Sequence, residues 1–166
     1  MTTLLAQADD ALLSAEQRKL QHRSPESALS FTVSLNADRR RVFHVLTISE
    51  YMETWLAVPG RHPKSPLHVV SSTDGFHIRY FDEMENPTTL VGAYQTFRTA
   101  KTNFLWRRAV DLDPEPSIVK IRLNGDFERT TLSLTHTGLK SGEDLQWHSQ
   151  LWEQSLDKLT SLFELQ

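Results

Sequence analysis

Two histidines are the residues of this sequence best placed for acid–base chemistry. His136 alternates with Leu132 and Leu134, so it is expected on the same inward face of a strand as those two leucines. His148 lies three residues after Leu145, on the apolar stripe of a predicted helix. Because imidazole titrates near neutral pH, the pair could orient a ligand or exchange protons with it. The alternative is that each histidine is held by hydrogen bonds to nearby backbone.

Other catalytic or metal-binding patterns are missing from the sequence. There is no cysteine, which excludes a disulfide framework, a thiolate zinc site and a cysteine nucleophile. His62 and His68 flank a proline-rich loop without the spacing of a zinc motif. No phosphate-binding loop, nucleophile elbow or dinucleotide fingerprint is present. We therefore predict no catalytic residue, no metal and no cofactor, and favour a protein that is not an enzyme, while leaving an enzyme open.

Aromatic residues on predicted inward faces form the best candidate for a binding site. They could simply fill an ordinary core, or they could line a pocket that is mostly apolar with a few polar groups. The tyrosines and tryptophans among them each carry a polar group that needs a partner when buried. The predicted cavity residues, with the two histidines, are Trp55, Phe76, Tyr80, Tyr94, Phe104, Trp106, His136, His148 and Trp152.

A long amphipathic helix near the end of the chain must position part of this set. Ser141, three residues ahead of Asp144, is expected to cap its first turn. The helix is predicted to continue from there towards residue 166. Its apolar stripe has spacings of three and four and consists of Leu145, His148, Trp152, Leu156, Leu159 and Phe163. Such a stripe must be buried against another part of the protein.

Short segments of alternating apolar and polar residues precede this helix and predict a sheet. The expected strands are 28–36, 67–72, 76–83, 88–98, 103–110, 118–124 and 130–136. Two short helices are expected after the first strand, the first capped by Asn36 or Asp38 and the second over 48–56, followed by an irregular loop over 58–66. We predict an α+β fold in which a curved antiparallel sheet of about seven strands wraps one long helix, leaving a concave space between them.

Three stretches, in this order, resemble the START-like (SRPBCC) superfamily. VFHVLTISEYMETWL resembles its early pair of short helices, VGAYQTFRTAKTNFLWRRA its G-x-Y and F-x-W strands, and THTGL, SGE and WEQSLDKL its C-terminal signature. Within the superfamily, the sequence is most similar to the family named after the activator of the heat-shock-90 ATPase (AHSA). The resemblance covers roughly residues 28–163 and implies a helix-grip (START-like, Bet v-like) fold with the order β-α-α-β6-α.

Residues 1–24 lie outside this resemblance and are predicted to form a helical extension. Leu4, Leu5, Ala8, Ala11, Leu12 and Ala15 recur at near-helical intervals. The extension could dock on the outer surface of the sheet, contact a second subunit, or fray. Residues 25–166 are assigned to the START-like domain.

Charge and hydropathy exclude several classes of partner. The 166 residues carry a net charge of −3 with acidic and basic residues interspersed, so nucleic-acid binding is not expected. No apolar segment approaches the roughly 20 residues that span a bilayer, and no signal peptide is recognisable, so we expect a cytoplasmic protein. The sequence leaves a monomer and a homodimer open.

Three functions follow from the sequence and the resemblance. The favoured one is binding of a small hydrophobic or aromatic ligand, lipids included, in a cavity between helix and sheet. The resemblance also implies two alternatives. One is a chaperone-associated or other protein-interaction module with a part in the stress response, and the other is a polyketide-cyclase-like enzyme.

Overall fold

The computed structural model describes residues 27–109 and 115–164. The helical extension expected over 1–24 lies outside the described residues, and so do residues 110 and 165–166, the predicted ends of one strand and of the last helix. None of the helices within the described ranges is long and apolar enough to cross a membrane.

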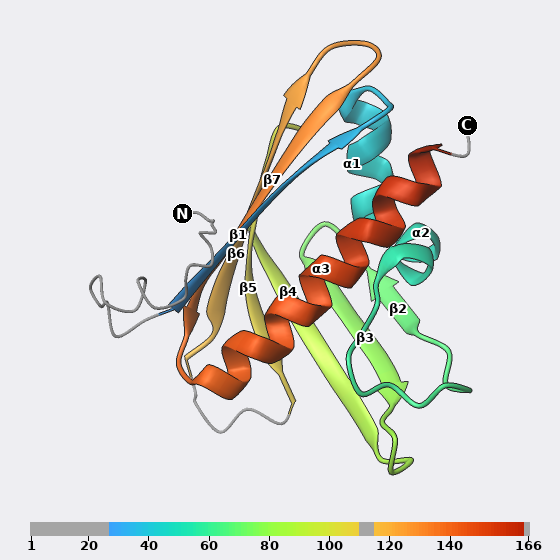
Figure 1. Ribbon diagram of the computed structural model, residues 1–166, viewed down its shortest axis with the longest axis vertical. Coiled ribbons are helices and arrows are strands. Elements are labelled where there is room, and N and C mark those ends of the chain that lie inside the picture. Colours follow the sequence, from blue (N-terminus) through green and yellow to red (C-terminus); the bar gives the residue numbers. More distant parts are fainter. Residues whose placement is uncertain (1–26, 110–114, 165–166) are drawn as a thin grey trace.

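Seven antiparallel strands form one continuous sheet in the order β1-β7-β6-β5-β4-β3-β2 (Figure 1). Strands β2 to β7 pair with their neighbours in sequence, and β1 joins the sheet beside β7. The strands are β1 Ser27–Leu35, β2 His68–Ser71, β3 Gly75–Phe81, β4 Pro87–Arg98, β5 Lys101–Arg108, β6 Ser117–Gly125 and β7 Thr130–Leu139.

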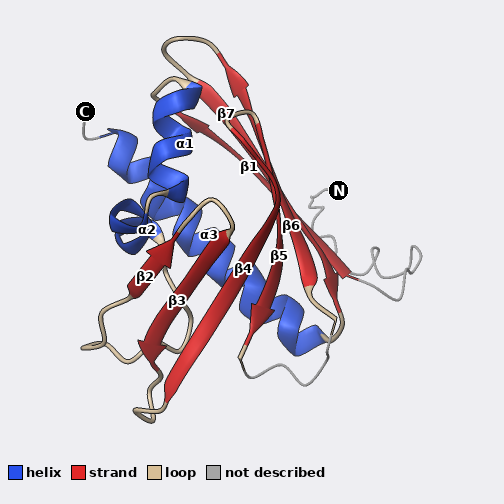
Figure 2. Ribbon diagram, turned by 180° about the vertical axis from the view of Figure 1, so that it is seen from behind, coloured by secondary structure: helices blue, strands red, loops and turns tan. Residues whose placement is uncertain are grey.

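Three helices lie on one face of this sheet. The short helices α1 (Arg39–Thr47) and α2 (Ser49–Trp55) connect β1 to β2, and α3 (Gly142–Glu164) follows β7. Figure 1 shows α3 crossing in front of the sheet, and Figure 2 shows the strands in front of α3 from the opposite side. The predicted α+β helix-grip fold with the order β-α-α-β6-α is confirmed.

Side-chain caps begin two of the helices where the sequence predicted them. Oδ1 of Asp38 accepts a hydrogen bond from the Arg41 backbone N–H at 2.8 Å, which satisfies one of the free donors in the first turn of α1. Oγ of Ser141 accepts a hydrogen bond from the Asp144 backbone N–H at 3.0 Å at the start of α3. Asp38, rather than Asn36, is therefore the cap of α1.

The core lies between the inner face of the sheet and the buried stripe of α3. Along β3, Phe76, Ile78 and Tyr80 are buried, whereas His77 and Arg79 between them are exposed, as the alternation predicted. The buried residues of α3 are His148, Leu151, Trp152, Ser155, Leu156, Leu159 and Phe163. The stripe differs from its predicted members at both ends of the comparison: Leu151 and Ser155 are also buried, whereas Leu145 is only half-buried.

The predicted end of the last strand at residue 136 is wrong, because β7 continues to Leu139. Gly138 reads as a turn residue, but it lies within the strand with a φ of 87°, at an irregularity between the pairs Leu29–His136 and Ser27–Leu139. A positive φ of this kind is a backbone conformation that glycine adopts readily. His136 is therefore an interior residue of a central strand, paired with Leu29 on β1 and Val119 on β6.

An irregularity in β4 places two aromatic side chains on the same face. The pairing with β5 shifts between Tyr94 and Thr96, so that Gln95 is an extra residue. Tyr94 is paired with Phe104, and Phe97 is paired with Thr102. Tyr94 and Phe97 thus lie on one face although only two residues separate them, and their ring centroids are 4.4 Å apart. The sequence predicted a turn over 99–102, whereas Thr102 is a buried residue of β5.

Candidate functional site

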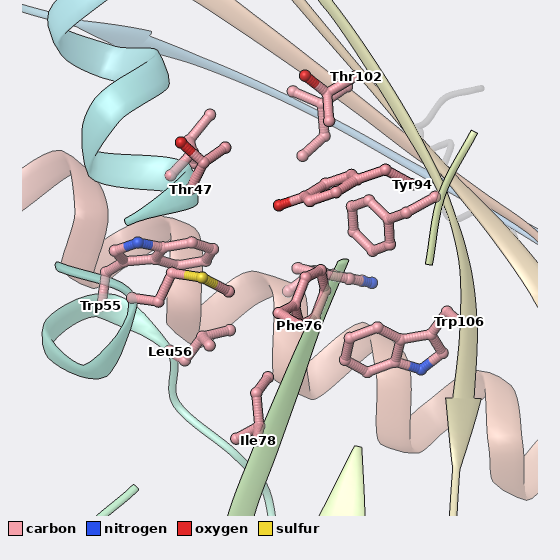
Figure 3. Close-up of a pocket in the computed structure, with 13 residues that line it drawn as sticks. Thr47, Trp55, Leu56, Phe76, Ile78, Tyr94, Thr102 and Trp106 are labelled. Atoms are coloured by element: carbon pink, nitrogen blue, oxygen red, sulfur yellow. The ribbon is translucent and has the colours of Figure 1, made fainter. Parts of the chain in front are cut away.

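A cavity lies between the inner face of the sheet and the helices, and no charged side chain lines it. Its volume is about 440 Å³, part of which is open to solvent, and the space in which the centre of a water molecule fits is about 30 Å³. Figure 3 shows its side chains gathered around this space. The thirteen lining residues are Leu46, Thr47, Met52, Trp55, Leu56, Phe76, Ile78, Tyr94, Thr102, Phe104, Trp106, Ile121 and Trp152.

Every layer of the fold contributes to this lining. The end of α1, two residues of α2 and Leu56 after it form one side, four strands from β3 to β6 form the opposite side, and α3 contributes Trp152. Trp55 is held in place because its indole N–H donates to the Val45 carbonyl at 2.8 Å. The cavity therefore lies where the sheet curves around the helices.

The sheet side of the cavity is a cluster of aromatic rings in contact. The Phe76 ring lies 5.2 Å from that of Phe104 and 5.8 Å from that of Tyr94, in both cases edge to face. Phe104 and Trp106 follow along β5 with their ring centroids 6.2 Å apart. Such pairs favour fixed relative orientations, so this side of the cavity is a rigid apolar surface.

The polar atoms at the cavity belong to Thr47, Thr102 and Tyr94, apart from the tryptophan nitrogens. Oγ1 of Thr47 donates to the Phe43 carbonyl at 2.7 Å, and Oγ1 of Thr102 donates to the Arg98 carbonyl at 3.0 Å. The Tyr94 hydroxyl has no hydrogen bond to any described residue, and Figure 3 shows it pointing across the space towards Thr47. Burial raises the pKa of Tyr94 to about 12, so this hydroxyl is protonated at neutral pH and available as a donor.

The two histidines lie beneath the cavity rather than in its lining. Their ring centroids are 4.7 Å apart, which confirms that they approach each other, and both are almost completely buried. The indole N–H of Trp106 donates to Nε2 of His148 at 2.8 Å, and that of Trp152 donates to Nδ1 of His136 at 2.9 Å. Trp106 and Trp152 therefore present only ring carbons to the cavity, since both indole nitrogens are bonded on the far side.

These hydrogen bonds assign the neutral tautomer of each histidine. Nε2 of His148 accepts a hydrogen bond, so the proton is on Nδ1, which donates to the Asp144 carbonyl at 2.8 Å. Nδ1 of His136 accepts a hydrogen bond, so the proton is on Nε2, which lies 2.7 Å from Oγ of Ser117. Burial, with a smaller effect of His148, lowers the pKa of His136 to about 2. His136 is thus neutral at physiological pH.

The short contact between Ser117 and His136 has the separation of a nucleophile and its base, but the proton is in the wrong place. A general base needs a lone pair facing the serine hydroxyl. In this pair Nε2 of His136 carries the hydrogen, because Trp152 occupies Nδ1. His136 therefore donates to Ser117 and does not activate it. Ser117 was not identified from the sequence, because no spacing along the chain relates it to His136.

Six of the nine predicted cavity residues line the cavity, and three do not. His136 and His148 hold the tryptophans from below, and Tyr80 is buried elsewhere along β3, where burial raises its pKa. His136 is bonded to the side chains of Ser117 and Trp152 rather than to nearby backbone, which differs from the alternative drawn from the sequence, whereas Nδ1 of His148 is bonded to the Asp144 carbonyl, as that alternative expects. The six that line the cavity are Trp55, Phe76, Tyr94, Phe104, Trp106 and Trp152.

Sequence reasoning missed the cavity threonines. Thr47 is the last residue of α1, and Thr102 was placed in a turn, so neither carried a signal of inward orientation. Among the described residues, no group of three or more His, Asp or Glu side chains could hold a metal ion.

The sequence matches the family model described as "Activator of Hsp90 ATPase homolog 1-like protein" over residues 36–164. The chain belongs to this family. No curated protein matches the sequence. The family assignment agrees with the resemblance found in the sequence motifs, which covers almost the same residues.

Solved structures share the fold of this AHSA1-like chain at low sequence identity. A protein from Chromobacterium violaceum is 18% identical with a TM-score of 0.66, and covers 82% of this chain and 96% of its own. The AHSA1 protein from Silicibacter pomeroyi is 19% identical with a TM-score of 0.65, covering 84% and 99%. The Aha1 dimer from Colwellia psychrerythraea is 12% identical with a TM-score of 0.61, covering 83% and 96%. These likenesses show the fold.

Proposed function

We propose that this protein binds a small apolar or aromatic molecule in the cavity between the sheet and the helices. The observation that carries the proposal is a lining of thirteen uncharged residues, most of them aromatic or aliphatic, around space that protein atoms do not fill. Ligand sites are concave and mostly apolar, with a few polar groups that orient the ligand. An ordinary core would be closed by its own side chains to the packing density of an organic crystal.

The dimensions of the cavity restrict the size of this ligand. Typical pockets for small molecules have volumes of about 300–1,000 Å³. The 440 Å³ found here includes the part open to solvent, and only about 30 Å³ admits the centre of a water molecule. A ligand of one or two rings would therefore require side chains such as Met52 to move, and a lipid chain would require a larger rearrangement.

The hydrogen-bond network argues against a catalytic role for the histidines. Both ring nitrogens of His136 and of His148 are bonded within the protein, and neither ring lines the cavity. A general acid or base must reach the reacting atom directly or through one water molecule. A polyketide-cyclase-like reaction would thus have to proceed without the two residues that the sequence favoured for acid–base chemistry.

Calorimetric titration of the full chain with naphthalene and with 1-decanol tests the proposal. The two probes represent an aromatic and a lipid-like ligand, and we expect naphthalene to bind more tightly. A Leu46→Phe variant places a larger side chain in the cavity and should weaken binding at least tenfold. The matched control is Val70→Phe, because Val70 is 61% exposed and does not line the cavity.

The outcomes of this titration separate the alternatives. Binding that Leu46→Phe weakens and Val70→Phe leaves unchanged supports the cavity as the site. Equal binding by both variants would place the probe elsewhere on the protein. Absence of binding by either probe, up to its solubility limit, would reject the proposed function.

Membership of the AHSA1-like family supports a second candidate, association with the heat-shock-90 chaperone. This candidate predicts that the full chain raises the ATPase rate of the purified chaperone and sediments with it. An unchanged rate together with separate sedimentation would reject it. The two candidates are independent, since Leu46→Phe should weaken ligand binding without altering the outer surface.

A further inference from the structure

The hydrogen-bond donors of the cavity restrict its ligand further, provided that the cavity binds a ligand as proposed above. Six lining residues have a polar hydrogen on the side chain, and five of these hydrogens are donated to acceptors of the protein. Three are the indole hydrogens, which go to the Val45 carbonyl, His148 and His136. The other two are the threonine hydroxyl hydrogens, which go to backbone carbonyls of Phe43 and Arg98.

Tyr94 is the exception in this set. Its hydroxyl makes no hydrogen bond to any residue within 27–109 or 115–164, and it points across the cavity (Figure 3). In the absence of a ligand, water can satisfy this donor, because Tyr94 is only partly buried. A hydrocarbon that displaced that water would leave the donor without an acceptor, which is unfavourable. A ligand with an acceptor atom would replace the water.

The cavity also disfavours a charged ligand. None of the thirteen lining side chains is ionisable except that of Tyr94, which stays neutral. An anion transferred into such surroundings would lose its hydration without gaining a counter-charge. A carboxylate bound at Tyr94 would receive one hydrogen bond and no salt bridge from the lining.

We propose that the cavity selects neutral aromatic molecules that carry one hydrogen-bond acceptor, such as a phenol, an aromatic alcohol or an aromatic ketone, and that Tyr94 donates the hydrogen bond that orients them. The apolar body of the ligand would lie among Phe76, Trp106 and Trp55, and its oxygen would lie at the Tyr94 hydroxyl. Aromatic carboxylates would be excluded.

A series of three naphthalene probes tests this selectivity by calorimetric titration of the full chain. We expect 2-naphthol to bind at least about tenfold more tightly than naphthalene, since it satisfies the Tyr94 donor. Hydrophobicity alone predicts the opposite order, because naphthol is the more water-soluble of the two. We expect 2-naphthoate, measured at pH 7, to bind more weakly than both.

The variant Tyr94→Phe removes the donor and keeps the ring. It should weaken 2-naphthol binding about tenfold and leave naphthalene binding unchanged or slightly tighter. This variant is expected to fold, because the Tyr94 hydroxyl has no bond to the described residues that folding would lose. Tyr51→Phe is the matched control, since Tyr51 is 47% exposed on α2 and does not line the cavity, and it should alter neither affinity.

Failure of this inference is distinguishable from failure of the proposed function. Equal affinities for naphthol and naphthalene, unaffected by Tyr94→Phe, would overturn the role of Tyr94 while leaving an apolar binding site. Tightest binding by 2-naphthoate would overturn the preference for neutral ligands. Absence of binding by naphthalene and naphthol alike would remove the proposed function, and this inference with it.

Discussion

The residues beneath the cavity explain how tryptophans can line an apolar space. A buried indole nitrogen needs an acceptor, and a neutral imidazole has one acceptor nitrogen. His148 and His136 accept from Trp106 and Trp152, and both hydrogen bonds point away from the cavity. The histidines therefore make the cavity surface apolar, although they are polar themselves.

Replacing Trp152 with Phe should show how much one of these hydrogen bonds contributes to the free energy of unfolding. The substitution leaves Nδ1 of His136 buried without its donor, and an unsatisfied buried acceptor costs about 1–3 kcal/mol. We expect the free energy of unfolding in urea to fall by this amount, with a further loss from the smaller ring. Trp147→Phe is the comparison, because Trp147 is half-buried and stacks on Arg108 at 4.0 Å. A greater loss from Trp147→Phe would contradict the assigned role of His136.

The depressed pKa of His136 predicts a pH dependence of stability. The pKa is about 2 in the folded protein, against an ordinary value of 6.5 that we expect in the unfolded chain. Between these values the unfolded chain binds a proton that the folded protein does not. The contribution to the free energy of unfolding is therefore complete above pH 6.5 and falls as the pH decreases, by at most about 1.4 kcal/mol per pH unit.

Urea unfolding at pH 7, 6 and 5 measures this slope. His136→Gln keeps one acceptor and one donor without titrating, so its slope should be shallower than that of the wild type. His77→Gln, on the exposed outer face, should retain the wild-type slope. A second measurement needs no variant, because the ring signals of His136 in NMR spectra should not shift between pH 7 and pH 5. A shift of those signals in the folded protein would show that the residue titrates.

At the scale of single elements, Gly92 in β4 illustrates why the G-x-Y stretch has its glycine. Gly92 is paired with Phe76 on β3, and a Cβ at this position would overlap the Phe76 ring. The ring lies over the glycine, a known way of covering the gap that a glycine leaves in a sheet. The resemblance identified the motif, but only the pairing of β3 with β4 shows what the motif does.

Gly92→Ala should consequently push Phe76 into the cavity. We expect a loss of stability of about 1–3 kcal/mol, typical of overpacking, and weaker binding of naphthalene. Gly142→Ala is the matched control, because a Cβ there meets no atom within 4 Å and alanine favours the first turn of α3. Calorimetric melting of both variants measures the difference. Partial recovery in a Gly92→Ala, Phe76→Leu double variant would confirm the steric cause.

Periodicity was sufficient to predict the type of most elements, because apolar residues at a period of two or 3.6 must share one face. Phe76, Ile78 and Tyr80 were placed correctly on this basis, and so was the stripe of α3 from His148 onwards, although Leu145 is only half-buried. It failed where pairing between strands overrides the local pattern. The extra residue Gln95 and the positive φ of Gly138 depend on partners far along the chain. The tautomers of the histidines are equally invisible to the sequence, since they depend on which atom faces which.

At the scale of the whole molecule, the candidate site lies between the curved sheet and the helices that it wraps. All seven strands and α3 lie within the described residues, and the family match begins at residue 36. Strand β1 pairs with β7 along most of its length, so one edge of the sheet is formed by residues after 26. These observations support the proposal that residues 25–166 form a domain on their own.

Removing residues 1–24 tests this boundary. No contact among residues 27–109 and 115–164 would be lost, so we expect a chain beginning at Pro25 to melt cooperatively, with its Tm within a few degrees of the full chain. Its affinity for 2-naphthol should be unchanged, because every lining residue lies after residue 45. An unfolded shortened chain would contradict the boundary.

Light scattering on both chains then separates the roles considered for the extension. A dimer that becomes a monomer indicates contact with a second subunit, a lower Tm without a change in mass indicates docking on the same domain, and equal behaviour indicates fraying.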